Sequence, residues 1–380
     1  MSKELKKCPV SKYCGACQYQ GIEYDKQLAI KQEKIEQLFP NYQVNKIIGG
    51  DNQYFYRNKS QMSFAKDRKG HIYMGNYVTS THQIVDIDNC QLVNKIGNDI
   101  FNTIKRLVIK YHISIYDEII HKGFLRHVLI RNSYDDKQFM VVLVCGHSRF
   151  DKKDLFIKEL LKIHPIIKTI ILNINNARTS MILGKKDIIL YGKGYIEDKL
   201  FDKTYRISNS CFFQINHDQC EKLYTNAIDL ANIKKDDIVL DAYCGIGTIT
   251  LQLAQKAKMV TGVEINKRSI EDAIKNAKRN KIDNVEFYAD DASLFMKKAL
   301  KQKKEYDLLF VDPPRNGLDN NFIYSLIKLR PNKIVYISCN PYTQKDDINK
   351  LKRYYDIKLI QPVDMFPLTD HIESICLLES

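Results

Sequence analysis

The second half of the chain alternates apolar strands with helices at short, regular intervals, and this alternation constrains the fold more than any other feature. Apolar runs typical of buried strands begin near residues 238, 259, 285, 306 and 333, and a stretch with helical spacing follows each of them. Such alternation indicates a parallel sheet with helices on both faces. We therefore predict that residues 206–380 form an α/β Rossmann-like domain with a mostly parallel sheet.

A different pattern precedes this domain. From about residue 44 to residue 205, short runs rich in β-forming residues alternate with turns, and one helix is expected over residues 154–163. This pattern predicts a mixed α+β domain over residues 44–205. Residues 1–43, together with the surroundings of Cys90, form a separate cysteine-cluster region. A chain of 380 residues is long enough for two or three domains.

The positive charge of the chain lies in its first half. Residues 1–205 contain 33 Lys and Arg against 21 Asp and Glu, a net charge of +12, whereas residues 206–380 carry +2. A basic half of this kind is typical of proteins that bind nucleic acid, although lysines also serve merely to keep a protein in solution. No stretch approaches the ~18 consecutive apolar residues of a membrane span, and the first residues lack the apolar core of a secretory signal. We expect a cytoplasmic monomer.

A glycine-containing loop follows the first strand of the predicted sheet. Gly245 and Gly247 lie between that strand and the next helix, where glycines let the backbone approach a ligand closely. Thr250 stands where a dinucleotide-binding loop has its third glycine, which argues against a pyrophosphate and for a nucleoside such as S-adenosylmethionine. Glu264 ends the second strand, at the place where a carboxylate accepts hydrogen bonds from a ribose. The alternative is a tight turn without a ligand.

Two consecutive carboxylates, Asp290 and Asp291, follow the third strand. One of them is suited to accept a hydrogen bond from the adenine amino group, and the other is suited to cap the next helix. We favour Asp291 for the ligand.

Three further strand ends carry a carboxylate, a thiol and a second carboxylate. Asp312 follows the fourth strand, Cys339 follows the fifth, and Glu373 precedes a final apolar stretch. Neighbouring strand ends meet at one edge of an open α/β sheet, so these side chains are expected to converge on one cleft. Taken singly, each has an ordinary explanation: the prolines after Asp312 end a strand, Cys339 packs in the core, and Glu373 is a charge on the surface. Their order behind a nucleoside-type loop favours a catalytic site with the Cys339 thiol as nucleophile.

These motifs resemble those of the S-adenosylmethionine-dependent RNA uracil-C5 methyltransferases. The matching segments of the second half are, in order, residues 212–216, 241–247, 312–318, 338–341 and 366–373. Weaker matches in the first half are residues 56–59 and 123–131. The resemblance therefore covers nearly the whole chain. An amino-group methyltransferase is a further alternative, but it requires an aromatic residue after Asp-Pro-Pro, where this chain has Arg315.

The resemblance implies a covalent mechanism for the methylation of uracil. Carbon 5 of uracil is a poor nucleophile, and addition of a thiolate at carbon 6 makes it reactive. By resemblance, Cys339 is the nucleophile, and Glu373 rather than His371 is the base that removes the carbon-5 proton. The cofactor-binding residues that the resemblance implies are Gln214, Tyr243, Thr248, Glu264, Asp291 and Asp312. Two of them, Gln214 and Asp312, also position the uracil. The target base must leave its stack to reach such a site.

Four of the ten cysteines point to a metal site. Cys8, Cys14 and Cys17 lie close together in the sequence, and Cys90 lies far downstream. Three clustered thiolates with one remote partner favour a [4Fe–4S] cluster, whereas a structural zinc site usually offers two close pairs. Zinc and unrelated free thiols are the alternatives.

The resemblance strengthens the cluster, because ribosomal members of the family bear this arrangement of cysteines. Many of these members also carry a small β-barrel RNA-binding domain ahead of the cysteines. Only seven residues precede Cys8, so we expect no such domain here. The chain is therefore most similar to the short 23S rRNA uridine methyltransferases with an iron–sulfur cluster.

Basic residues beside aromatic ones mark the expected RNA contacts. Arg57 and Lys59 follow three consecutive aromatic residues, an arrangement suited to stacking bases and binding phosphates, or else to a core strand with charged flanks. Arg126 and Arg131 are further candidates. We therefore predict a 23S rRNA uracil-C5 methyltransferase. The alternatives are the same reaction on a tRNA uridine and a non-enzymatic, zinc-stabilised RNA-binding protein.

Overall fold

The structure is a computed structural model that describes residues 7–79, 81, 83–179 and 181–380. The chain divides into two compact units. Of the described residues, the first unit contains 7–21, 52–199 and 208–210, and the second contains 22–51, 200–207 and 211–380. Residues 22–43, which the sequence analysis places in the cysteine region, thus belong to the second unit. The remaining domain boundaries stay a prediction.

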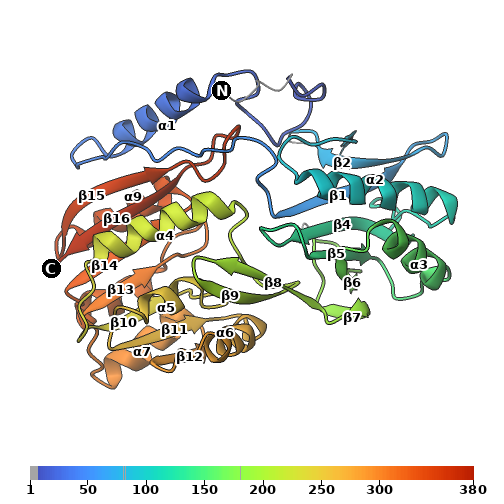
Figure 1. Ribbon diagram of the computed structural model, residues 1–380. Helices are drawn as coiled ribbons and strands as arrows, with labels where there is room; N and C mark the ends of the chain where they lie inside the picture. Colours follow the sequence, from blue (N-terminus) through green and yellow to red (C-terminus); the bar gives the residue numbers. More distant parts are fainter. Residues whose placement is uncertain (1–6, 80, 82, 180) are drawn as a thin grey trace. The chain divides into compact units, whose positions relative to one another are not determined.

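The second unit is built on a seven-stranded sheet (Figure 1). In sheet order its strands are β12 (Val285–Ala289), β11 (Met259–Glu264), β10 (Ile238–Ala242), β13 (Leu308–Val311), β14 (Lys333–Ser338), β16 (Glu373–Glu379) and β15 (Asp356–Val363). The first five run parallel, and β16 is antiparallel to both of its neighbours. The chain order reverses between β10 and β13, which is where open α/β sheets bind their ligands. This sheet confirms the predicted Rossmann-like fold.

Seven helices of the described residues belong to this unit. They are α1 (Tyr24–Leu38), α4 (His217–Ala231), α5 (Thr248–Leu253), α6 (Lys267–Arg279), α7 (Ala292–Lys301), α8 (Asn320–Leu329) and α9 (Pro341–Leu351). In Figure 1, α4 crosses in front of the sheet, and it contacts β14 and β16. Two further strands, β8 (Tyr195–Leu200) and β9 (Lys203–Ser208), pair as a separate small sheet; residues 195–199 and Ser208 are counted with the first unit and the remaining residues of both strands with the second.

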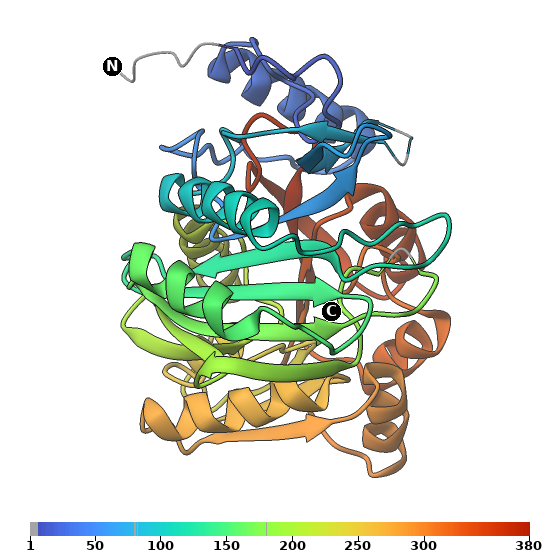
Figure 2. The ribbon, with the colours of Figure 1, turned by 90° about the vertical axis from the view of Figure 1, so that its right-hand side faces the viewer.

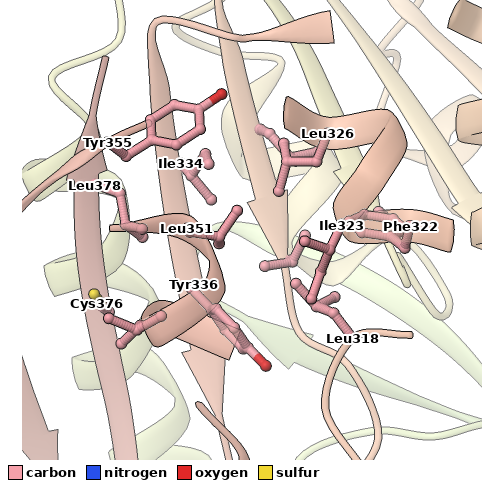
Figure 3. Packing of buried hydrophobic residues seen from close by; sticks show 14 of the residues in the cluster. Leu318, Phe322, Ile323, Leu326, Ile334, Tyr336, Leu351, Tyr355, Cys376 and Leu378 are labelled. Carbon is pink, nitrogen blue, oxygen red and sulfur yellow. The ribbon is translucent and has the colours of Figure 1, made fainter. Parts of the chain in front are cut away.

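A hydrophobic core lies between the sheet and α7, α8 and α9. Alternate strand residues contribute to it, among them Ile334 and Tyr336 of β14 and Cys376 of β16, as Figure 3 shows. Ile35 of α1 and Phe39, which follows α1, are buried in the same core. Burial of a large apolar side chain contributes roughly 1.5–3 kcal/mol. This packing explains why a segment from the start of the chain joins the second unit.

The first unit contains another seven-stranded sheet, which is mostly antiparallel. In sheet order its strands are β3 (Ile84–Asp86), β2 (Ile72–Tyr77), β1 (Lys59–Lys66), β4 (Leu125–Asn132), β5 (Phe139–Cys145), β6 (Ile167–Ile174) and β7 (Lys186–Gly192), and β5 and β6 are the parallel pair. Two helices, α2 (Lys95–Lys110) and α3 (Lys153–Ile163), lie in front of this sheet in Figure 2. The mixed α+β architecture agrees with the prediction, and α3 matches the predicted helix.

Candidate active site

The loop after β10 is shaped to admit a ligand. Gly245 has a φ of +56°, and a Cβ added there would meet nothing within 4 Å. Gly247 also has a positive φ, +83°, and stands directly before α5. Thr250, at the place of the absent third glycine, donates from Oγ1 to Oδ2 of Asp241 at 2.5 Å. The hydrogen bond between Thr250 and Asp241 therefore holds the loop in place, and the space beside Gly245 is open, which suits a bound nucleoside.

Glu264 lies beside this loop, at the end of the neighbouring strand β11. Its Oε1 accepts a hydrogen bond from the backbone N–H of Asn266 at 2.8 Å, and the side chain is half-buried. Tyr243 lies in the loop itself and Thr248 is the first residue of α5, and both are half-buried. Tyr243 has a φ of +72°, which is costly for a non-glycine residue and is typical of ligand-binding loops. The predicted ribose carboxylate and the glycine loop are thus brought together.

The two carboxylates after β12 have separate roles within the protein. Oδ1 of Asp291 accepts from the backbone N–H of Leu294 at 3.0 Å and caps α7. Oδ2 of Asp290 lies 2.5 Å from Nζ of Lys298. Asp291, which the sequence analysis favours for the ligand, therefore has one carboxylate oxygen engaged in capping.

The thiol and the predicted base lie at the ends of paired strands. β14 and β16 are antiparallel neighbours in which Ser338 pairs with Ser374, so Cys339 and Glu373 come directly after and directly before these partners. Asp312 follows β13, the strand on the other side of β14. The tertiary structure thus brings together the carboxylate, thiol and carboxylate that the sequence places 61 residues apart along the chain.

A helix start fixes the backbone around Cys339. Asn340 caps α9 by accepting from the N–H of Tyr342 at 3.2 Å, and Pro341 occupies the first turn. Both choices are favoured at helix N-termini. Cys339 therefore stands between the last residue of a strand and the cap of a helix.

Burial and mutual repulsion control the protonation of these groups. Burial, followed by the charges of Glu373 and Asp312, raises the pKa of the Cys339 thiol to about 11. Burial and then Asp312 raise the pKa of Glu373 to about 8, and burial raises that of Asp312 to about 7. Arg315 opposes the shift at both Cys339 and Glu373. Glu373 Oε2 is buried and has no hydrogen-bond partner within the described chain.

A cavity of about 280 Å³ opens beside the thiol. Its walls come from α1, the Asp-Pro-Pro-Arg loop, the start of α9 and the segment before β16, and they comprise Lys34, Ile35, Leu38, Arg315, Cys339, Asn340, Pro341, Tyr342, Asp370, His371 and Ile372. Arg315, Lys34 and Tyr342 were not predicted as site residues. Arg315 lies in a recognised motif and was accessible to sequence analysis, whereas Lys34 carries no local signal. His371 lines the wall with an exposed side chain.

The remaining predicted uracil-positioning residue, Gln214, is buried in the segment before α4. Its neighbour Asn216 caps α4 and donates from Nδ2 to the carbonyl of Met365 at 3.0 Å. The Gln214 segment is therefore tied to the chain that leads into Glu373. Phe212, two residues before Gln214, is 60% exposed.

The four cysteines of the first unit share a neighbourhood without forming a complete site. Gln20 accepts from the N–H of Cys8 and hydrogen-bonds the Cys17 thiol. Burial, followed by the charge of Cys90, raises the pKa of Cys17 to about 12, and Cys14 adds to the shift. Among the residues described, however, no three His, Cys, Asp or Glu side chains are arranged to hold a metal ion. The structure therefore does not confirm the predicted metal site.

The predicted RNA-binding arginines of β4 are interior residues. Arg126 is 3% exposed, donates to the carbonyl of Asn175 at 2.8 Å and pairs with Glu118 at 3.0 Å. Arg131 is 1% exposed. Both guanidiniums are therefore placed to support the first unit rather than to reach a phosphate at its surface. Arg57 and Lys59 are half-buried and line a cavity of about 220 Å³ with Cys90.

Comparison with known proteins identifies the family. Residues 23–380 match the model of the tRNA (uracil-5-)-methyltransferase family. An uncharacterized RNA methyltransferase of Oceanobacillus iheyensis is 41% identical over 371 residues, which cover 96% of this chain and 81% of the relative. A protein of the same description from Staphylococcus aureus strain N315 is 38% identical over 376 residues, covering 97% and 83%.

A solved structure extends this likeness to three dimensions. The Pyrococcus abyssi tRNA (uracil-54, C5)-methyltransferase in complex with S-adenosyl-L-homocysteine matches with a TM-score of 0.79 and 26% identity, covering 99% of this chain and 88% of that one. Within the described part of the chain, no helix is long and apolar enough to cross a membrane. The chain belongs to the tRNA (uracil-5-)-methyltransferase family and is an RNA methyltransferase for carbon 5 of uracil.

Proposed function

We propose that this protein methylates carbon 5 of a uridine in 23S rRNA through a covalent bond between Cys339 and carbon 6 of the base. The observation that carries the proposal is the position of Cys339, which lines a cavity large enough for a pyrimidine and lies next to the buried Glu373 across two paired strands. The unpartnered Oε2 of Glu373 supports its role, because a buried carboxylate oxygen without a donor is ready to accept a proton.

In the proposed reaction, the Cys339 thiolate forms a bond to carbon 6, and the electron pair of the 5,6 double bond moves into the ring as an enolate. Carbon 5 then carries the charge that accepts a methyl group. S-adenosylmethionine, which the Gly245 loop and Glu264 would hold, would supply this methyl group: its bond from sulfur to the methyl carbon would break, and S-adenosylhomocysteine would be the leaving group. Glu373 takes the carbon-5 proton, the double bond re-forms, and the bond from carbon 6 to Cys339 breaks to return the thiolate.

Arg315 has a defined task in this scheme. Its positive charge counteracts the shifts that raise the pKa of Cys339 and of Glu373, so it stabilises the ionised forms that addition and proton removal require. Its position is fixed by its own carbonyl, which accepts from Asn340 Nδ2 at 3.0 Å and Thr343 Oγ1 at 3.1 Å. The segment that contains Cys339 and the segment that contains Arg315 are therefore held together by the hydrogen bonds from Asn340 and Thr343 to the carbonyl of Arg315.

Replacement of the base is expected to separate addition from release. In Glu373→Gln the thiol can still add, but the carbon-5 proton stays, so a protein–RNA adduct should persist with ordinary uridine RNA and turnover should fall by about 10²–10⁴-fold. The wild-type rate should rise with pH through about 8, since the carboxyl must be ionised to accept a proton. Glu373→Gln should lack this rise of the rate with pH. Glu379→Gln, at the far end of β16, is the matched control; wild-type turnover by Glu373→Gln would refute the assignment.

A tRNA uridine is the second candidate substrate. The family description and the Pyrococcus abyssi structure both name tRNA, whereas the likeness of the cysteine arrangement to ribosomal members favours 23S rRNA. Methylation assays on 23S rRNA and tRNA transcripts distinguish the two, and a preference for tRNA would overturn the ribosomal proposal. Mapping of 5-methyluridine in RNA from cells with and without this chain then locates the target.

We further propose a [4Fe–4S] cluster on Cys8, Cys14, Cys17 and Cys90. The spacing of the cysteines and the electrostatic influence of Cys90 and Cys14 on Cys17 support it. Protein purified without oxygen should be brown and contain about four irons per chain. Cys17→Ala should lose the colour and the iron, whereas Cys145→Ala, a buried cysteine of β5, should keep both. Colourless protein with one zinc per chain would contradict the cluster.

A further inference from the structure

One face of α1 runs along the active-site cavity. Lys34 and Ile35 follow Lys31 by three and four residues, and Gln27 and Leu38 lie one turn before and one turn after them, so the five residues share a side of the helix. Lys34, Ile35 and Leu38 line the cavity that contains Cys339. A helix that precedes the methyltransferase fold by nearly two hundred residues thus forms a wall of its site.

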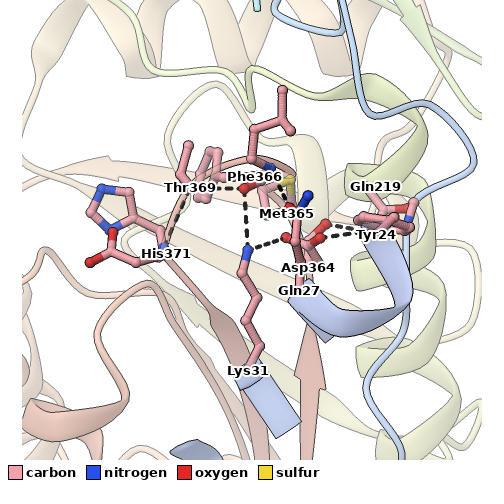
Figure 4. A network of polar contacts seen from close by, with 12 residues as sticks. Tyr24, Gln27, Lys31, Gln219, Asp364, Met365, Phe366, Thr369 and His371 are labelled. Atoms are coloured by element: carbon pink, nitrogen blue, oxygen red, sulfur yellow. Dashed lines mark hydrogen bonds and ion pairs between the residues drawn. The ribbon is translucent and has the colours of Figure 1, made fainter. Parts of the chain in front are cut away.

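A buried ion pair holds this helix against the catalytic segment, as Figure 4 shows. Nζ of Lys31 lies 2.6 Å from Oδ1 of Asp364, and both side chains are fully buried. The same ammonium donates to the carbonyl of Phe366 at 3.2 Å, and Tyr24 donates to Asp364 Oδ2 at 2.8 Å. Lys31 therefore spans the turn that leads toward Glu373.

The next residues of the turn are held as firmly. Oε1 of Gln27 accepts from the backbone N–H of Leu368 at 2.9 Å, and Gln219 donates to the carbonyl of Asp364 at 2.8 Å. Such a network fixes the helix in rotation as well as in position, because it engages two successive turns of α1. Lys34, one turn beyond Lys31, is consequently presented at the cavity in a defined place.

Resting on the proposed function, we propose that Lys34 binds the backbone phosphate of the nucleotide whose uracil enters the cavity. Uracil is neutral, and a base that has left its stack carries its negatively charged phosphate to the cavity mouth. Of the two cations in the wall, Arg315 acts on Cys339 and Glu373. The other cation is the exposed side chain of Lys34, which has a flexible stem suited to a phosphate.

The test compares Lys34→Met with Lys26→Met, an exposed lysine of the same helix that lies outside the cavity wall. Binding of substrate RNA is measured without methyl donor over a range of salt concentrations. Lys34→Met should weaken binding about tenfold at low salt and reduce the slope of log K against log salt by about 0.7. Lys34→Arg should restore both, and Lys26→Met should change neither. Equal effects of the two methionine variants would overturn the proposal.

A second measurement assigns the contact to the phosphate. RNA with uncharged methylphosphonates on either side of the target uridine should bind wild type and Lys34→Met equally, because the partner of the lysine is gone. A difference that survives this change, or slower adduct formation with an unchanged salt slope, would place Lys34 on the base and refute the phosphate contact. Failure of wild type to form any adduct with 5-fluorouridine RNA would instead refute the proposed function, since the binding measurement requires no chemistry.

Discussion

Cys339→Ala is expected to abolish methyl transfer, with a loss of at least about 10⁴-fold, because it removes the one thiol among the described residues that line the cavity, and the proposed addition to carbon 6 requires a thiolate. The same variant should form no covalent complex with RNA that contains 5-fluorouridine. Fluorine cannot leave as a cation, so the wild-type protein should be trapped after methyl transfer as an adduct that survives denaturing electrophoresis.

Cys376→Ala is the control for this experiment. Cys376 lies on β16 opposite Tyr336 and is buried in the core, so its replacement tests loss of a thiol from the same unit without touching the cavity. It should retain the adduct and most of the activity. An adduct in Cys339→Ala would show that another residue is the nucleophile and would remove the basis of the proposed mechanism.

The second large effect is on stability. Lys31→Met should lower the free energy of unfolding by about 3–5 kcal/mol, because it leaves the carboxylate of Asp364 buried without a counter-charge. Burial acts to lower the pKa of Lys31, and Asp364 opposes this effect, so each charge depends on the other. The double variant Lys31→Met/Asp364→Leu should recover most of the loss, since both charges are then absent.

Urea unfolding of the single and double variants measures this coupling. Lys26→Met is the matched control, because Lys26 pairs with Glu23 in solvent, and exposed pairs contribute less than about 1 kcal/mol. A Lys31→Met protein as stable as Lys26→Met would contradict the role of the buried pair. The double variant should also lack the Lys31 contact to Phe366, so recovery of stability without recovery of activity would indicate that this contact positions the catalytic segment.

Sequence patterns predicted the elements around the catalytic groups but not every element. The strands that end near Asp241, Asp312 and Cys339 were located because apolar runs and breakers are local signals. Helix α2 was missed, although Ile100, Ile104 and other buried residues recur in it at helical spacing. β15 was also missed; its alternately exposed first half is a weaker signal than the continuous apolar run of a central strand.

Charge in the sequence was a poor guide to exposure. Arg126 and Arg131 were predicted at an RNA interface, yet both are buried in β4. A sequence shows that a residue is cationic but not whether backbone carbonyls and carboxylates surround it, and that environment decides which partner it binds. The same reasoning applies to Asp291, whose capping role depends on where α7 begins.

The sequence by itself determined the class of fold and predicted the reaction chemistry. A thiol after one strand, carboxylates at others and a glycine loop without its third glycine are local features, and strand ends converge in every open α/β sheet. Only the tertiary structure decided that α1 forms a wall of the cavity. That placement depends on Lys31 meeting Asp364, 333 residues away, and on Ile35 entering the core. These contacts join groups that are far apart in the sequence and are buried together in the folded chain. No local sequence pattern therefore predicts them.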